Sequence, residues 1–274
     1  MRRLLGTVVA LLLVLASPAV QATHIPVVPD EDNPLEFESR VAALLSWGEF
    51  DPLVEIEARF EDEGGNVPRE LERELRYKAL TIGSYYRLHR NVKAGAFVRL
   101  QVGARHDDDW TEPLPAVWEW EDSTDRLEAV AILDVTPRFQ LDFVPGENWV
   151  IALKTRYELN TFNLQQSIKV RPGLTYFWIV DRNPVLNVTA SYEAYFPLNF
   201  GATLIYEQWA YLNLLYHLTP TLKLEASVAR RTVIWSDSEE FDEAHPTENY
   251  GGQDSFIKYR PWVLGFGILV MIPL

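Results

Sequence analysis

The sequence predicts an all-β chain that closes into an antiparallel up-and-down barrel of about ten strands. Three observations support this prediction: apolar and polar residues alternate over most of the chain, short and long connections separate the alternating segments, and aromatic residues reach 12%. A period of two places successive side chains on opposite faces of a strand, whereas a helix repeats every 3.6 residues. A chain of 274 residues is long enough for one complete barrel.

The clearest alternating segment covers residues 92–105. Small aliphatic residues at the even positions lie on one face, and Lys93, Phe97 and Arg99 lie on the other. Similar alternation predicts the remaining strands, with ends defined to within a few residues. The predicted strands cover residues 52–61, 70–89, 92–106, 126–142, 148–161, 165–180, 185–197, 203–218, 221–236 and 255–273.

The connections between these segments alternate in length. Short connections with turn-forming residues lie around 89–91, 145–147, 181–184 and 218–220. Long connections cover 62–69, 106–125 and 237–254, while those around 161–163 and 197–202 are short exceptions. This alternation resembles that of Gram-negative outer-membrane β-barrel proteins, in which short turns face the periplasm and long loops face outwards. An even strand number would place both termini on the periplasmic side.

The first 22 residues have the features of a secretory signal peptide. Arg2 and Arg3 precede an apolar run from Leu4 to Ala16, and small residues end at Ala22, where cleavage is expected. The apolar run is too short to span a membrane as a helix. We therefore predict that residues 1–22 are an export signal and that the chain leaves the cytoplasm.

Residues 23–50 are predicted to be a periplasmic leader that precedes the barrel domain at residues 51–274. Prolines and the acidic run Asp30 to Asp32 indicate an extended segment. Phe37, Val41 and Leu44 recur at helical spacing, which predicts a short amphipathic helix over residues 37–47. This helix would lie in the lumen as a plug or lean on the periplasmic rim, and a flexible leader is the alternative.

Aromatic residues concentrate near the ends of the apolar strand faces, as in the interfacial girdles of membrane barrels. They are Trp149, Tyr157, Tyr176, Trp178, Tyr192, Tyr206 and Tyr216. A soluble β-sandwich is the alternative interpretation, but such a sandwich rarely needs about ten strands of this length. The aromatic positions therefore favour strands that cross a membrane.

The polar strand faces carry charges of both signs, which we expect to line the lumen. The residues predicted to face the lumen are Arg59, Arg99, Arg105, Arg138, Lys154, Arg156, Glu158, Lys169, Arg171, Glu193, Glu207, Lys223, Glu225 and Arg231. A barrel of about ten strands is narrow, and charges buried inside it need partners. Interleaved signs favour a mostly filled, salt-bridged lumen, and a narrow aqueous pathway is the alternative.

Composition excludes several kinds of chemistry. A net charge of −14 opposes nucleic-acid binding, and the absence of cysteine excludes thiolate catalysis, disulfides and a lipoprotein anchor. Asp107, Asp108 and Asp109, beside His106, are candidate ligands for a divalent cation in an acidic outer loop. The spacing is not that of a calcium loop, so a solvated acidic loop is the simpler reading. No cofactor is predicted.

The resemblance to Gram-negative outer-membrane barrels spans about residues 51–274 and rests on pattern. It implies residence in the cell outer membrane, contact with its lipid and lipopolysaccharide, and insertion by the barrel-assembly machinery. Our first functional hypothesis is a non-enzymatic structural or surface role. The second is a narrow porin-like channel for small polar solutes. The third is a surface hydrolase similar in architecture to the omptin family, whose catalytic pattern this sequence only partly matches.

Overall fold

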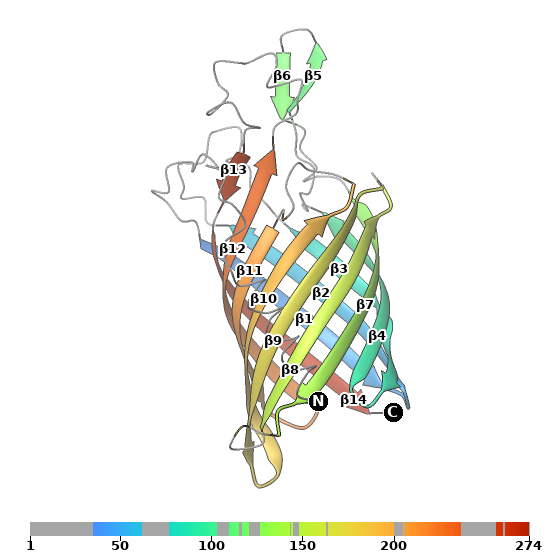
Figure 1. The fold of residues 1–274 in the computed structure, drawn as a ribbon, viewed down its shortest axis with the longest axis vertical. Helices are drawn as coiled ribbons and strands as arrows, with labels where there is room; N and C mark the ends of the chain where they lie inside the picture. Colours follow the sequence, from blue (N-terminus) through green and yellow to red (C-terminus); the bar gives the residue numbers. More distant parts are fainter. Residues whose placement is uncertain are drawn as a thin grey trace.

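The computed structural model describes residues 35–61, 77–102, 110–114, 117–120, 127–142, 148–162, 164–199, 207–236, 256–259 and 261–273, with residues 144 and 205. Eleven strands of the described chain close into one barrel, which confirms an all-β barrel of about ten strands (Figure 1). The barrel strands are β1 (Leu35–Ser46), β2 (Phe50–Glu61), β3 (Lys78–His89), β4 (Val92–Val102), β7 (Glu128–Gln140), β8 (Trp149–Asn160), β9 (Gln166–Val180), β10 (Asn183–Pro197), β11 (Glu207–His217), β12 (Leu222–Ser236) and β14 (Trp262–Pro273).

The barrel closes through a parallel pair, while the other neighbouring barrel strands are antiparallel. In the register of β1 with β14, Leu35 pairs with Trp262 and Ser46 pairs with Pro273. The two strands therefore run from the end with the long connections to the end with the short turns, where the C-terminus lies in Figure 1. The expectation of an even strand number is wrong, because an eleventh strand precedes the ten predicted ones. The first barrel strand consequently starts at the long-connection end.

That eleventh strand is β1, so the expected short helix over residues 37–47 is wrong. Residues Leu35–Ser46 pair along their length with β2 on one side and with β14 on the other. The two neighbouring strands satisfy the backbone hydrogen-bonding groups of this segment. An isolated helix of this length is only marginally stable, so strand pairing is favoured. The barrel therefore begins at Leu35 rather than at residue 51. The predicted signal peptide and residues 23–34 lie outside the described residues.

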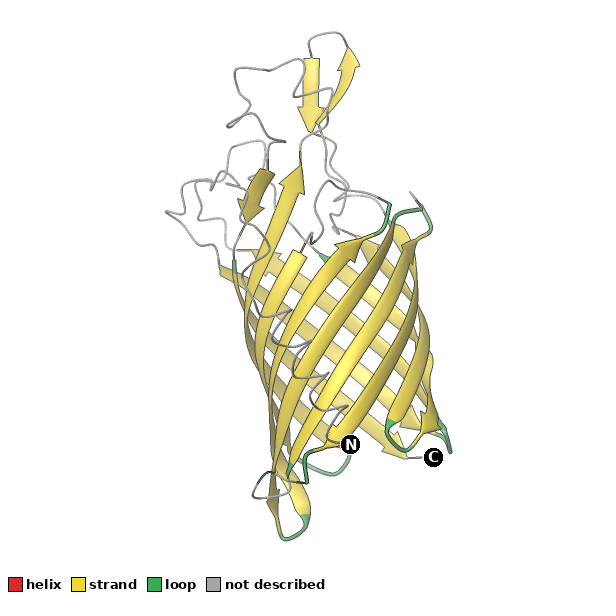
Figure 2. Ribbon diagram, in the orientation of Figure 1, coloured by secondary structure: helices red, strands yellow, loops and turns green. Residues whose placement is uncertain are grey.

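Three further short strands lie beyond the barrel wall (Figure 2). β5 (Trp110–Leu114) and β6 (Val117–Trp120) form a separate antiparallel pair within the connection 106–125, which was predicted to be a plain loop. β13 (Phe256–Tyr259) pairs with the end of β12, so the predicted strand 255–273 is divided into β13 and β14. Within the described chain, no helix has the length and apolarity needed to cross a membrane.

The alternation of the sequence sets the direction of the side chains. On β7, Val130 and Ile132 are buried inside the barrel, where they pack with Phe97. Leu133, the residue between Ile132 and the inward-facing Asp134, is 59% exposed on the outside. Neighbouring strands alternate in the same way, because residues that pair across two strands point to the same face of the sheet. The interior therefore holds most of the charge, and the exterior is apolar.

Candidate functional site in the barrel lumen

Two clusters of buried charged side chains lie on the inner wall of the barrel, in the half nearer the long connections. We call this set the ion-pair layer: Glu36, Arg59, Arg99, Glu128, Glu158, Lys169, Glu207 and Arg231. These side chains come from strands on both sides of the barrel, and each is placed inside by the period-two alternation of its strand. Their burial requires partners, because an unpaired charge in this environment would be strongly destabilising.

The first part of the layer is centred on Glu158 of β8. Arg99 of β4 donates two hydrogen bonds to its carboxylate, at 2.8 and 3.3 Å, and Lys169 of β9 lies 3.0 Å from the same group. The paired oxygens of a carboxylate match the fork of the guanidinium, which makes this a strong and well-oriented contact. One carboxylate thus compensates two buried cations, and Arg156 adds a third at 3.7 Å.

Neutral amides extend this part of the layer toward Glu128 of β7. Arg99 Nε donates to the Gln101 side-chain oxygen at 2.7 Å, and the Gln101 amide donates to Glu128 at 3.1 Å. Asn160 donates a further bond to Glu128 at 3.0 Å. Glu128 therefore accepts two amide hydrogen bonds, and the chain of bonds fixes the rotamers of residues on three strands.

The second part of the layer joins the first two strands of the barrel to β11 and β12. Arg231 of β12 donates to Glu207 of β11 at 2.7 Å and to Glu36 of β1 at 3.2 Å. The indole of Trp209 also donates to Glu207, at 2.6 Å. The guanidinium of Arg59, which lies 3.8 Å from Glu36, sits 5.0 Å from the ring centre of Trp209. These contacts link β1, β2, β11 and β12 across the parallel closure.

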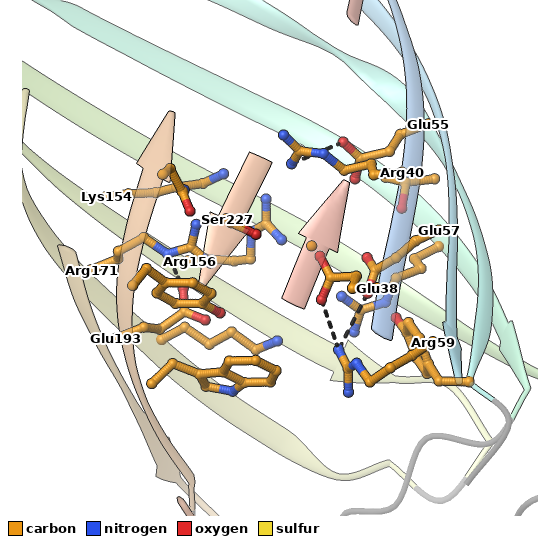
Figure 3. Close-up of a pocket in the computed structure, with 18 of the residues that line it drawn as sticks. Glu38, Arg40, Glu55, Glu57, Arg59, Lys154, Arg156, Arg171, Glu193 and Ser227 are labelled. Atoms are coloured by element: carbon orange, nitrogen blue, oxygen red, sulfur yellow. Dashed lines mark hydrogen bonds and ion pairs between the residues drawn. The ribbon is translucent and has the colours of Figure 1, made fainter. Parts of the chain in front are cut away.

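A polar cavity of about 230 Å³ lies in the lumen, and part of its lining comes from the ion-pair layer: Arg59, Arg99, Lys169, Glu207 and Arg231. Every barrel strand except β7 contributes to its lining. Figure 3 shows Glu38, Glu55 and Glu57 on one side of the cavity and Lys154 and Arg171 on the other. The cavity greatly exceeds the roughly 10–15 Å³ that one water molecule requires, so the lumen is not completely filled.

A smaller charged cluster lies at the short-turn end. Asp51 of β2 is buried, and its two oxygens accept from Arg87 at 3.0 Å and from Lys93 at 2.6 Å. The Ser46 hydroxyl donates to the same carboxylate at 3.2 Å. Arg87 remains about half exposed, so this cluster sits at the mouth of the barrel rather than in its middle.

The structure places most of the predicted lumen residues on inward strand faces, and most of these take part in ion pairs. The paired ones are Arg59, Arg99, Lys154, Arg156, Glu158, Lys169, Arg171, Glu193, Glu207, Glu225 and Arg231. Lys223 and Arg138 occupy inward register positions near the short turns, where Arg138 is exposed. Arg105, Asp107, Asp108 and Asp109 lie outside the described residues, so the divalent-cation site stays a prediction.

Three lumen residues of β1 were missed by sequence reasoning. Glu36, Glu38 and Arg40 point inward, and Arg40 pairs with Glu55 and Glu225. The period-two signal was present, since these charges alternate with apolar or small residues. It was obscured by the continuous apolar run from Val41 to Leu45, which fits a helical face equally well.

The outer surface of the barrel wall is apolar at mid-height. Ile56, Ile82 and Val98 lie on three successive strands, β2 to β4, and each is more than half exposed. Leu133 continues this surface on β7. Closer to the short turns, outward aromatic rings meet in pairs: Trp149 with Tyr176, with ring centres 4.9 Å apart, and Phe50 with Tyr86 at 5.0 Å. Large exposed apolar surfaces of this kind are typical of sites that contact another protein or a membrane.

Comparison with protein-family models and with curated proteins finds no match to this chain in either set. Among the described residues, no group of three or more histidine, aspartate or glutamate side chains is arranged to hold a metal ion. The site therefore has to be interpreted from its own geometry: a charge-paired lumen, a polar cavity and an apolar exterior.

Proposed function

We propose that this chain is an integral outer-membrane β-barrel protein with a structural or surface role rather than a catalytic one. The observation that carries the proposal is the distribution of polarity across the wall. Charged side chains are buried inside, whereas large aliphatic residues such as Ile56 and Leu133 are about 60% exposed outside at mid-strand. A soluble barrel has the opposite arrangement, because its apolar residues fill the interior.

The outward aromatic pairs support the same proposal. Trp149 and Tyr176 lie at the start and near the end of their antiparallel strands, where the barrel wall approaches the short turns. An aromatic ring with a polar edge is favoured at the boundary between hydrocarbon and headgroups. The partners that this placement implies are outer-membrane lipid and lipopolysaccharide around the wall, and the barrel-assembly machinery during insertion.

The ion-pair layer supports a lumen that is closed to bulk ion flow. Its carboxylates and cations are almost fully buried and hold one another across strands that are distant in sequence. Separating such a pair would leave uncompensated charges in a narrow interior, which is strongly unfavourable. We therefore propose that the layer keeps the barrel wall rigid and blocks the lumen at this level.

Membrane insertion is tested by refolding the full chain in detergent and then transferring it to lipid vesicles. The expected result is that the chain floats with the vesicles and that its mobility in a denaturing gel changes on boiling, because a closed barrel resists unfolding in cold detergent. A chain that stays soluble without detergent and migrates identically before and after boiling would overturn the proposal.

A narrow channel for small polar solutes is the second candidate function. The cavity of about 230 Å³ with charged walls is the observation that favours it. A channel needs a continuous aqueous path, whereas the proposed closed barrel needs only an isolated polar cavity. Ion conductance across a planar bilayer separates these two functions.

A further inference from the structure

The cavity has opposite charge on opposite walls. Around the ring of strands, four strands separate β1 from β8 in one direction, and four strands separate β1 from β9 in the other. The pair β8–β9 therefore faces β1 and its neighbour β2 across the lumen. Figure 3 shows this relation, with Lys154 and Arg171 on the side opposite Glu38 and Glu57.

The charges that line the cavity differ between these two walls. The β8–β9 wall contributes Lys154, Arg156, Lys169 and Arg171 and no carboxylate. The β1–β2 wall contributes three carboxylates and two arginines: Glu38, Glu55, Glu57, Arg40 and Arg59. One wall is thus strongly cationic and the other has a net negative charge. The two walls create an electric field across the cavity.

The ion pairs of each wall do not remove this difference. On the cationic side, four cations share three carboxylates. Lys154 and Arg156 lie 3.5 and 3.3 Å from Asp134, Lys169 lies 3.0 Å from Glu158, and Arg171 lies 2.6 Å from Glu193 of β10. Glu158 also pairs with Arg99, so these carboxylates do not neutralise all the cations.

On the anionic side, Glu38 and Glu57 lie 3.5 and 3.3 Å from the guanidinium of Arg59, which also lies 3.8 Å from Glu36. Arg40 pairs with Glu55 and with Glu225 of β12, so the carboxylates outnumber the guanidiniums here. The β8–β9 wall therefore has more positive charge than its ion pairs neutralise, and the β1–β2 wall has more negative charge than its ion pairs neutralise. These two excesses face each other across the cavity.

Three charged groups of the two walls that do not belong to the ion-pair layer are more accessible than Glu158 at the centre of that layer. The side chains of Lys154 and Arg171 are 26% and 33% exposed, and that of Glu38 is 24% exposed, whereas Glu158 is 4% exposed. A small molecule in the cavity would consequently reach these charges directly. The cavity volume of about 230 Å³ has room for several non-hydrogen atoms and accompanying water.

We propose that this cavity binds a small zwitterionic solute of the amino-acid class. Its carboxylate would face Lys154, Arg156 and Arg171, and its ammonium group would face Glu38, Glu55 and Glu57. A solute with both charges complements both walls at once, and its dipole aligns with the field between them. A simple anion or cation complements one wall and leaves the other without a counter-charge.

This inference goes beyond the proposed membrane role and depends only on the folded barrel. Binding is measured by isothermal titration calorimetry on the full chain in detergent, after a boiling-dependent gel shift has shown that the barrel is folded. The probes are alanine, propionate and ethylammonium. Propionate and ethylammonium each keep one of the two charges of alanine at a similar size.

The expected result is that alanine binds at least tenfold more tightly than either propionate or ethylammonium. Lys154→Gln and Glu38→Gln should each reduce this preference at least threefold, since each removes one charge from one wall. Arg87→Gln is the matched control: Arg87 is charged and partly exposed, but it pairs with Asp51 outside the cavity and should leave alanine binding unchanged.

Two results would overturn the inference while leaving the membrane proposal intact. The first is a folded wild-type barrel that binds propionate or ethylammonium as tightly as alanine, which would make the cavity a site for a single charge. The second is a folded barrel with no measurable heat of binding for any of the three probes. The comparison of probes on the wild-type chain decides the question even if a cavity variant fails to fold.

Discussion

Arginine scanning along the outer face of β7 provides a quantitative test of membrane embedding. Leu133 and Phe139 face outward on β7, and Leu127 directly precedes the strand. The three positions are six residues apart, and Leu127, Leu133 and Phe139 are 64%, 59% and 43% exposed. A strand rises about 3.3 Å per residue and a barrel strand tilts by roughly 40°, so successive positions differ by about 15 Å along the barrel axis. With an apolar band about 25 Å tall, Leu133 lies near its middle and the other two positions lie near its edges.

The expected cost of each substitution follows from this depth. Leu133→Arg should lower the free energy of unfolding by about 2–4 kcal/mol, because the guanidinium would be placed near the bilayer midplane. Leu127→Arg and Phe139→Arg should each lower it by about 0–1 kcal/mol, because a long cation near the interface can extend toward water. In an aqueous environment all three exposed positions would tolerate arginine to within about 0.5 kcal/mol.

The assay is reversible urea unfolding of the refolded chain in lipid vesicles, followed by tryptophan fluorescence. A maximum of destabilisation at Leu133, flanked by small effects at Leu127 and Phe139, is the predicted profile. Equal and small effects at all three positions would refute the reasoning, because they would mean that the middle of the outer face contacts water.

Three further predictions concern the lumen and the closure of the barrel. Glu158→Gln should destabilise the folded chain by about 3–5 kcal/mol in the same urea assay, since it leaves buried cations without their shared carboxylate. Asp51→Asn should have a smaller effect of about 1 kcal/mol, because one of its two cations is half exposed at the barrel mouth; equal effects of the two variants would contradict this ranking. The register pairs Ser39 with Phe266, so a Ser39→Cys/Phe266→Cys double variant should form a disulfide in a chain that otherwise has no cysteine. The matched pair Ser39→Cys/Ile272→Cys should stay reduced, and the reverse outcome would exclude the parallel closure.

Sequence periodicity predicted most of the barrel wall because the exterior and interior of each strand have opposite polarity. The strands containing Lys93, Arg156 and Glu193 alternate without interruption, and their structural bounds differ from the predicted ones by a few residues. The failure at β1 has a physical cause. From Val41 to Leu45 both faces are apolar, so that a period of two and a period of 3.6 fit equally well. Only pairing with β2 and β14 decides between them.

The candidate site was predictable in composition but not in arrangement. Alternation indicated that Arg99, Glu158 and Lys169 face the lumen, and their mixed signs indicated pairing. The partners could not be assigned, because they depend on which strands adjoin and on their register. Glu36 shows this clearly: its partner Arg231 is 195 residues away and becomes a neighbour only through the parallel closure. The opposition of the two cavity walls likewise depends on the number of strands in the ring.

Conductance of the membrane-inserted chain tests the closed, ion-paired lumen most directly. The full chain is refolded, its insertion is established by vesicle flotation, and current is then recorded across a planar bilayer formed from the same vesicles. The closed barrel predicts a silent bilayer despite inserted protein. Stable unitary current steps that change in ion selectivity on Arg99→Gln substitution would contradict a closed lumen and place a conducting path through the ion-pair layer.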